Sequence, residues 1–317
     1  MIQIEADSMD KIQEEIISEL LKKGNRVKPR GQWIYEVNGL TFKLDNPRAR
    51  LIYNPERKYS LTFALGEFLW YLRGTNELDI MQYYNKRYVQ FSDDTKTLYG
   101  AYGPRIFGSN LVNGMSQWEM VFNKLKEDPD TRQAIICIYA ANDISAKTLD
   151  VPCTCYIQYF IRENKLNCIV NMRSNDIIWG TAYDVFSFTM LQELLANMLH
   201  IEMGWYIHFA GSMHIYDRHL KMAEKILVNQ DYQSFAMPKM PQNTAKSLKE
   251  VLVAEERIRL KGHSTDNLNI EYWRDILKVL KIYSQAKRGT KIEESIVEVP
   301  KYYRDLLVLH KSIYEKL

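Results

Sequence analysis

The segment Leu61–Leu72 (LTFALGEFLWYL) constrains the fold of this chain more than any other. Apolar residues occupy nearly every position, so the helix that it predicts must be buried on all sides. A chain of 317 residues can form a core large enough for that. Glu67 stands in the middle of the segment, where a carboxylate is costly unless it is paired or functional. Burial would raise its pKa into the range of a general acid or base, so a structural and a functional role are both open.

A second constraint is the segment 150–183, which predicts a β-hairpin. Two apolar runs, 156–161 and 166–172, flank a turn at Glu163-Asn164. Cys153 precedes the first strand and Arg173 follows the second, so the hairpin would bring a thiol close to a guanidinium. A fixed positive charge favours the thiolate that a nucleophilic cysteine needs. On these residues alone, a buried structural cysteine is the more common arrangement.

Apolar periodicity predicts further helices and strands, and together they indicate an α/β (α+β) fold. Helical spacing occurs in residues 9–23, 114–126, 181–200 and 211–228. Strand patterns occur in residues 134–139 and 201–209. Residues 33–37 and 40–44 flank Asn38-Gly39, the strongest short hairpin signal in the chain, so we expect a hairpin there.

The C-terminal part of the chain differs from the rest. Pro238 and Pro241 mark a boundary, and three charged helices are predicted beyond it, at 245–261, 271–288 and 301–317. We therefore predict a catalytic domain over residues 1–237 and a helical extension over residues 238–317.

The composition excludes several classes of protein. No apolar run approaches the ~18 residues of a membrane helix, and the acidic N-terminus lacks a signal-peptide core, so we expect a cytoplasmic protein. Four cysteines do not make a disulfide framework, and no Cys or His pair at ligand spacing completes a metal site with Cys153 and Cys155. A net charge of +3 gives no support for nucleic-acid binding, whereas 21 tyrosines suit a pocket for an anionic, aromatic small molecule.

Several motifs occur in an order and spacing that resemble thymidylate synthases and the related pyrimidine-nucleotide hydroxymethylases, over residues 24–237. They are Glu67-Phe68-Leu69-Trp70-Tyr71-Leu72-x-Gly74, Tyr102-Gly103, Asp128-Pro129-Asp130-Thr131-Arg132, Pro152-Cys153 with Gln158, Arg173-Ser174-x-Asp176 with Gly180 and Asp184, and His214-x-Tyr216. Each is weak alone, and the set is highly specific. The resemblance implies a mixed sheet flanked by helices, and it makes a functional role the better interpretation of Glu67 and Cys153.

The resemblance also implies chemical roles. Cys153 would add to C6 of a pyrimidine nucleoside monophosphate and make C5 nucleophilic, and Glu67 would move protons around the base. Asp184 and Tyr102 complete the implied catalytic set. The implied cofactor is 5,10-methylenetetrahydrofolate, the one-carbon donor, held by Asp176, Gly180, Tyr183, Tyr88 and Trp179.

The implied nucleotide contacts involve a homodimer. Arg173 and Ser174 would bind the 5′-phosphate, and Arg132 would reach it from the partner subunit. Arg30 would close over the phosphate, although Arg26 stands in the same basic loop and the choice between them is open. The sugar 3′-hydroxyl would be bound by His214 and Tyr216.

The departures from the family pattern carry information. Synthases that make thymidylate have an asparagine where this chain has Asp184, because an amide matches uracil. A carboxyl group that accepts from N4–H and shares a proton with N3 matches cytosine. Tyr88 stands where the family has a shielding tryptophan, and residues 238–317 replace a short tail that closes over folate. Thr154 stands where the family has a histidine after the catalytic cysteine, and Gln133 stands where it has a second phosphate-binding arginine.

These features favour 5-hydroxymethylation of CMP or dCMP, in which water captures the exocyclic methylene. Two alternatives stay open: 5-methylation of dUMP or UMP, as in a thymidylate synthase, and a catalytically silent nucleotide- or RNA-binding relative. The residues do not distinguish ribose from deoxyribose.

Overall fold

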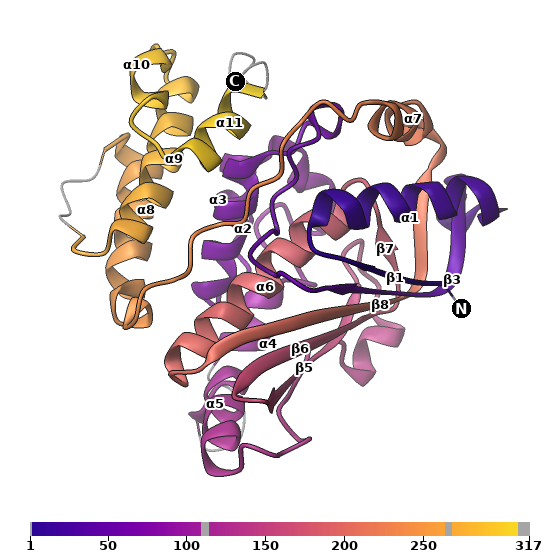
Figure 1. Cartoon of the computed structure of the whole chain (residues 1–317), viewed down its shortest axis with the longest axis horizontal. Helices are drawn as coiled ribbons and strands as arrows, with labels where there is room; N and C mark the ends of the chain where they lie inside the picture. Colours follow the sequence, from indigo (N-terminus) through magenta and orange to yellow (C-terminus); the bar gives the residue numbers. More distant parts are fainter. Residues whose placement is uncertain (1, 109–113, 264–267, 310–317) are drawn as a thin grey trace.

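A mixed eight-stranded sheet carries the fold of the computed structural model, which describes residues 2–108, 114–263 and 268–309 (Figure 1). The strand order is β1-β3-β8-β6-β5-β4, with β2 beside β3 and β7 beside β8. The strands are β1 (Ile2–Ala6), β2 (Asn25–Val27), β3 (Ile34–Leu44), β4 (Ile135–Cys137), β5 (Thr154–Arg162), β6 (Lys165–Met172), β7 (Asn175–Asp176) and β8 (Glu202–Tyr216). The predicted mixed sheet flanked by helices is confirmed.

The hairpin predicted in segment 150–183 is formed by β5 and β6, which pair antiparallel from Arg162 and Lys165 back to Thr154 and Met172. Glu163 and Asn164 both have positive φ angles, of 52° and 55°. A two-residue turn of this kind matches the right-handed twist of the strands, and asparagine tolerates the conformation. The turn residues therefore fix the register of the strand that follows Cys153.

The hairpin predicted around Asn38-Gly39 is wrong. Residues 34–44 form one continuous strand, β3, which pairs antiparallel with β8 in a single register across Gly39. Gly39 takes a φ of +68° within the strand, so its conformational freedom is used without reversing the chain. The long pairing with β8 outweighs the local turn signal.

The helix predicted from residue 211 is also wrong over its first part. β8 continues to Tyr216, because Met213–Tyr216 pair with Ile34–Val37 of β3, and the helix α7 (Leu220–Val228) begins only after that. His214 and Tyr216 therefore lie on a strand. Residues two apart on a strand point to the same face, which accounts for the His-x-Tyr spacing.

Helices cover one face of the sheet. α1 (Met9–Lys23) packs on β1 and β3, and α6 (Gly180–Met198) packs on β6 and β8. The opposite face of β5, β6 and β8 is only half-buried, and its apolar side chains lie side by side across the strands. They are Tyr156, Ile169, Ile207 and Phe209.

The helix over Leu61–Leu72, α2, is buried as predicted, since 11 of its 12 residues are buried. It lies between α6 on one side and the C-terminal helices α9 (Glu271–Lys287) and α11 (Lys301–Leu309) on the other (Figure 1). Helices on both sides explain why no polar stripe occurs in its sequence.

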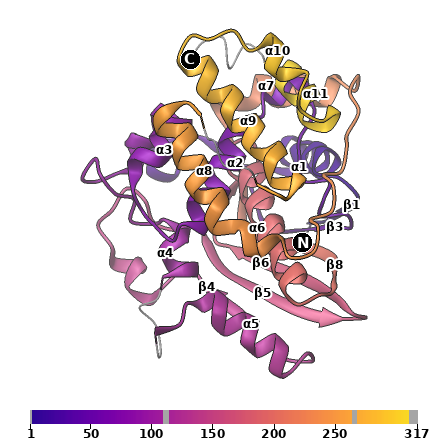
Figure 2. The ribbon, with the colours of Figure 1, turned by 90° about the vertical axis from the view of Figure 1, so that its left-hand side faces the viewer.

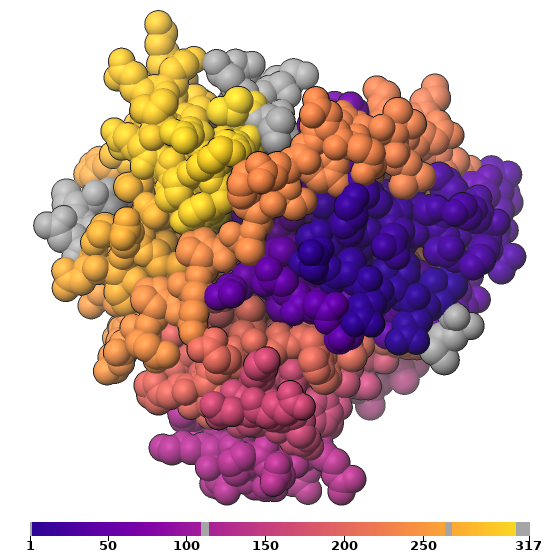
Figure 3. Space-filling view, viewed as in Figure 1, coloured from indigo at the N-terminus to yellow at the C-terminus, as the bar shows by residue number. Residues whose placement is uncertain are grey.

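The remaining helices surround this centre. They are α3 (Leu78–Tyr84), α4 (Tyr102–Phe107), α5 (Gln117–Glu127), α8 (Leu248–Lys261) and α10 (Glu293–Ile296). The space-filling view shows the C-terminal part, in orange and yellow, packed directly against the rest of the chain (Figure 3). The division after residue 237 stays a prediction, and residues 310–317 of the last predicted helix lie outside the described residues. In the described ranges, no helix is both long and apolar enough to cross a membrane.

Candidate active site

Cys153 lies immediately before β5, and Arg173 holds the loop that carries it. The Arg173 guanidinium donates from Nε to the Pro152 carbonyl oxygen (2.8 Å) and from Nη2 to the Val151 carbonyl oxygen (2.9 Å). Its Nη2 also lies 3.5 Å from Cys153 Sγ. The hairpin thus brings the thiol and the guanidinium together, as was predicted from the positions of Cys153 and Arg173 at its two ends. Burial raises the pKa of the Cys153 thiol, and the positive charge of Arg173 opposes that rise.

Glu67 and Tyr88 form the second part of the site. The Tyr88 hydroxyl donates to Glu67 Oε1 at 2.8 Å, from a 3₁₀ turn (Lys86–Phe91) that follows α3. Burial raises the pKa of Glu67 to about 8, the charge of Asp184 adds to the rise, and the Tyr88 hydrogen bond opposes it. A carboxyl group with this pKa can give or take a proton near neutral pH.

Asp184 lies one turn into α6, and a hydrogen-bond relay fixes it. Asn175 Nδ2 donates to Asp184 Oδ2 (2.8 Å), and Thr181 Oγ1 donates to Asn175 Oδ1 (2.6 Å). Burial raises the pKa of Asp184 to about 7. A Cβ at Gly180 would lie 3.0 Å from Asn175 Nδ2 and 3.4 Å from Asp184 Oδ2, so glycine leaves room for this relay.

Asn175, the unspecified residue in Arg-Ser-x-Asp, was not predicted from the sequence. Asn175 is buried, with 3% of its surface exposed, and both of its amide atoms are hydrogen-bonded. The signal available was an amide at the end of an apolar strand, where a polar side chain needs a partner.

Tyr102, the first residue of α4, lies beside the Cys153 thiol. Its hydroxyl oxygen accepts from the backbone N–H of Thr154 at 3.3 Å, and its ring stacks on Phe188 of α6. Burial raises the pKa of Tyr102 far above its ordinary value, so the phenol stays neutral. A catalytic role for Tyr102 stays a prediction.

The predicted sugar-binding pair lies at the end of β8. The His214 and Tyr216 rings meet edge to face at 5.3 Å, and the Arg218 guanidinium lies 3.9 Å from the Tyr216 ring centroid. His214 pairs in register with Asp176 of β7, which places the sugar candidates next to the strand that follows Arg173 and Ser174.

The predicted phosphate arginines are placed differently. Arg26 is ion-paired with Asp217 (2.8 Å) and lies over Trp33, whereas Arg30 has no ion-pair partner among the described residues. Arg30 takes a left-handed conformation (φ 48°) at an exposed turn, and its charge acts on Cys153. Of the two, Arg30 is therefore the better placed to bind an added anion.

Arg132 and Ser174 complete the predicted phosphate set. Arg132 is exposed, and its carbonyl oxygen accepts from Gln158 Nε2 at 2.9 Å. No hydrogen bond or ion pair joins its guanidinium to the site within the parts of the chain that the structure describes. Ser174 is half-buried directly after Arg173.

The predicted cofactor residues Asp176, Tyr183 and Trp179 also make contacts within the fold, and their role toward the cofactor stays a prediction. Asp176 accepts from the backbone N–H groups of Ile178 (3.0 Å) and Trp179 (3.3 Å), which shapes the entry into α6. The Tyr183 hydroxyl accepts from Ser60 N (3.1 Å), and its ring stacks on Tyr59. Trp179 is 39% exposed, with the Arg218 guanidinium 5.0 Å from its ring centroid and the His219 ring packed against it, so part of the indole stays accessible to a ligand.

Arg57 was not predicted from the sequence, and it is a strong candidate to bind an anionic group of a ligand. It is 3% exposed, and its guanidinium carbon lies 5.4 Å from the Tyr183 ring centroid. Nε and Nη2 are buried with no hydrogen-bond partner in the described structure. A buried guanidinium with free donors suits a carboxylate.

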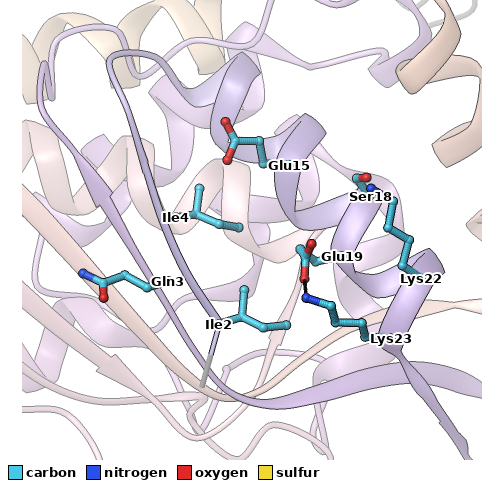
Figure 4. A pocket seen from close by; sticks show the side chains of 8 residues that line it. All are labelled: Ile2, Gln3, Ile4, Glu15, Ser18, Glu19, Lys22 and Lys23. Carbon is cyan, nitrogen blue, oxygen red and sulfur yellow. Dashed lines mark ion pairs between the residues drawn. The ribbon is translucent and has the colours of Figure 1, made fainter.

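A surface hollow elsewhere on the molecule is separate from this site. The hollow drawn in Figure 4 lies between β1 and α1, and its lining contains none of the residues discussed above. Within the described ranges, no cluster of three or more His, Cys, Asp or Glu side chains could hold a metal ion.

The raised pKa of Glu67 predicts how stability depends on pH. The folded state holds this proton up to about pH 8, whereas the unfolded chain releases it near the ordinary value of 4.5, so stability falls as pH rises between the two. Glu67→Gln removes this loss. The free energy of unfolding of the variant minus that of the wild type should therefore rise by roughly 3 kcal/mol from about pH 5 to about pH 8. Asp184 titrates in both proteins, but in the wild type its charge adds to the rise in the Glu67 pKa, so the difference between the two profiles reports Glu67 together with that interaction. Urea titrations at the two pH values measure the difference, and parallel pH profiles would contradict the prediction.

Comparison with known proteins gives one family match, two similar sequences and one similar solved structure. The family model described as thymidylate synthase matches residues 11–270. A deoxyuridylate hydroxymethyltransferase of Bacillus phage SP01 is 34% identical over 224 residues, which are 67% of this chain and 58% of the phage protein. A thymidylate synthase of Buchnera aphidicola (strain Sg) is 26% identical over 67% of this chain and 81% of its own length. Thymidylate synthase A of Bacillus subtilis has a similar fold, with a TM-score of 0.61, 23% identity, and coverage of 74% of this chain and 88% of that one.

Proposed function

This chain belongs to the thymidylate synthase family, and on that premise we propose that it is a one-carbon transferase acting on a pyrimidine nucleoside monophosphate. The proposed product is a 5-hydroxymethyl cytidylate, formed from CMP or dCMP. The proposed one-carbon donor is 5,10-methylenetetrahydrofolate, which leaves as tetrahydrofolate.

One observation carries the choice of base, the carboxyl group of Asp184 held by Asn175. Each carboxylate oxygen can accept two hydrogen bonds, so Oδ2 keeps a free lone pair and Oδ1 is free of Asn175. With a pKa of about 7, the group can accept from the cytosine N4 amino group and share a proton with N3. Uracil presents O4 and N3–H, which the ionised carboxylate does not match.

The residues of the site can be assigned steps. Cys153, with Arg173 favouring its thiolate, adds to C6 of the base. When bound, the cofactor would supply the methylene group that C5 receives. Loss of the C5 proton to water and cleavage of the C–N bond to the folate would then give the exocyclic methylene and tetrahydrofolate. Glu67 then takes a proton from the water that attacks the exocyclic methylene, and the Tyr88 hydroxyl holds Glu67 and leaves a polar group where water can bind. Release of Cys153 restores the ring.

The buried Arg57 guanidinium fits the proposed cofactor, since folates end in a glutamate whose carboxylates are anionic. Its free Nε and Nη2 donors lie beside the Tyr183 ring, in the part of the site where Tyr183 and Trp179 were predicted to hold folate. Arg57 would bind the acidic end of the cofactor, and Trp179 would offer an aromatic surface to its rings.

We also propose that the protein is a homodimer. The half-buried face of β5, β6 and β8 is the surface that a second copy would cover, because Tyr156, Ile169, Ile207 and Phe209 are only half-buried there and a group of apolar side chains of this kind marks an interface. The guanidinium of Arg132, unpaired within its own described chain, would then reach the partner's phosphate site.

The name of the phage relative favours a second candidate, hydroxymethylation of a uridylate. The two are separated by supplying methylenetetrahydrofolate with CMP, dCMP, UMP or dUMP and determining the mass of each product. The proposal expects a hydroxymethyl group on CMP or dCMP. A methylated uridylate formed with dihydrofolate would refute both hydroxymethylation and the choice of cytosine.

A further inference from the structure

Helix α9 holds the C-terminal end of α3. The Tyr283 hydroxyl lies 3.0 Å from the Tyr83 carbonyl oxygen and 3.1 Å from the Tyr84 carbonyl oxygen, and Lys287 Nζ donates to the Tyr83 carbonyl at 2.6 Å. The last carbonyl groups of a helix have no partner within it. Two side chains of the C-terminal helices supply those partners here.

Helix α8 reaches the same region through Glu255, which is 1% exposed. Its Oε1 accepts from the Tyr84 hydroxyl at 2.7 Å, and its Oε2 accepts from Arg73 Nη2 at 2.5 Å. Arg73 is the C-cap residue of α2, and it also donates to the Leu252 carbonyl oxygen of α8. Glu255 therefore links the ends of α2 and α3, and Arg259 balances its charge at 3.0 Å.

These contacts reach the Glu67–Tyr88 pair through one intervening residue, Tyr84. The Tyr84 ring packs so tightly on Gly66, the neighbour of Glu67, that a Cβ there would lie 2.5 Å from the ring. Tyr88 follows Tyr84 by one 3₁₀ turn. Figure 2 shows α8 and α9 standing beside α2 and α3. Displacing the end of α3 would move both partners of the hydrogen bond.

We propose that the C-terminal helices α8 and α9 position the Glu67–Tyr88 pair, with Tyr283 and Glu255 as the positioning residues. The inference rests on the proposed function, in which this pair directs water to the exocyclic methylene. Neither positioning residue contacts a substrate. They act through the backbone of α3 and the ring of Tyr84.

The test compares Tyr283→Phe with Tyr272→Phe. Both changes remove one hydroxyl from α9, but the one hydrogen bond of the Tyr272 hydroxyl among the described residues goes to Met190 Sδ of α6 (3.6 Å). For Tyr283→Phe, kcat should fall about fivefold or more while the KM for nucleotide changes less than about twofold, because the lost hydrogen bond serves the later proton transfer and not binding. Tyr84→Phe, which cuts the Glu255 link, should give the same split. Tyr272→Phe should match wild type.

The assay uses whichever of CMP, dCMP, UMP and dUMP the wild-type protein converts, so an error in the choice of base does not affect it. Equal kcat values for Tyr283→Phe and Tyr272→Phe overturn the positioning role. If the wild type converts none of the four, the proposed function fails, and amide hydrogen exchange of residues 78–91 decides the inference. Faster exchange in Tyr283→Phe than in Tyr272→Phe supports it, and equal exchange overturns it.

Discussion

Replacing Asp184 with asparagine is expected to reverse the base preference of the protein from cytidylate to uridylate. In the wild type, Asn175 Nδ2 donates to Asp184 Oδ2. In Asp184→Asn the same donor would fix the amide oxygen of residue 184, which leaves its other lone pair for uracil N3–H and its NH₂ for O4. A mismatched buried polar group costs several kcal/mol, so the ratio of kcat/KM values for the two bases should change by about 10³-fold or more.

Asp184→Ala is the matched control, because it removes the carboxyl group without offering an amide. It should lower kcat/KM for both bases and reverse neither. Competition between dCMP and dUMP, or CMP and UMP, at equal concentrations measures the ratio directly. If Asp184→Asn keeps the wild-type preference, residues other than Asp184 select the base, and the assignment of cytosine is wrong.

Replacing Cys153 with serine is expected to abolish turnover, with a loss of about 10³-fold or more in kcat, since a serine hydroxyl is a far weaker nucleophile at neutral pH than a thiolate beside a guanidinium. The covalent adduct with a 5-fluoropyrimidine nucleotide should also disappear from the mass spectrum of the protein. Cys155→Ser is the control, because Cys155 lies two residues further along and is half-buried like Cys153. It should keep its activity, and an active Cys153→Ser would exclude nucleophilic catalysis by this thiol.

Cys153→Ser also tests the homodimer. When Cys153→Ser and Arg132→Ala are unfolded, mixed and refolded together, they should form hybrid dimers. In each hybrid, one site carries both changes and the other carries neither. Two inactive proteins would then regain roughly a quarter of the wild-type activity, as random pairing in a twofold dimer requires. No recovery would mean that Arg132 serves the site of its own chain.

Much of the fold follows from local sequence. The apolar segment Leu61–Leu72 and the helix from Gly180 are decided by their own residues, and Glu163-Asn164 defines its hairpin through positive φ angles. The two errors share one cause, the long pairing of β3 with β8. That pairing passes through Asn38-Gly39 and carries β8 on to Tyr216, where local signals predicted a turn and a helix.

The site could be predicted where two ends of one hairpin meet, as Cys153 and Arg173 do. Contacts that depend on how distant helices dock could not. The hydrogen bond of Tyr88 to Glu67 needs α3 placed beside α2, and the free donors of Arg57 become visible only once its neighbours are known. The Asn175–Asp184 bond similarly joins a strand end to the next helix.

The enclosure of α2 between α6 and the C-terminal helices has a consequence for synthesis on the ribosome. The helix that carries Glu67 leaves the exit tunnel long before α9 and α11 do, although both pack against it. Until they emerge, its outer apolar face stays uncovered, where chaperones can bind it. The packing around Glu67 is therefore complete only once α9 and α11 have been synthesised.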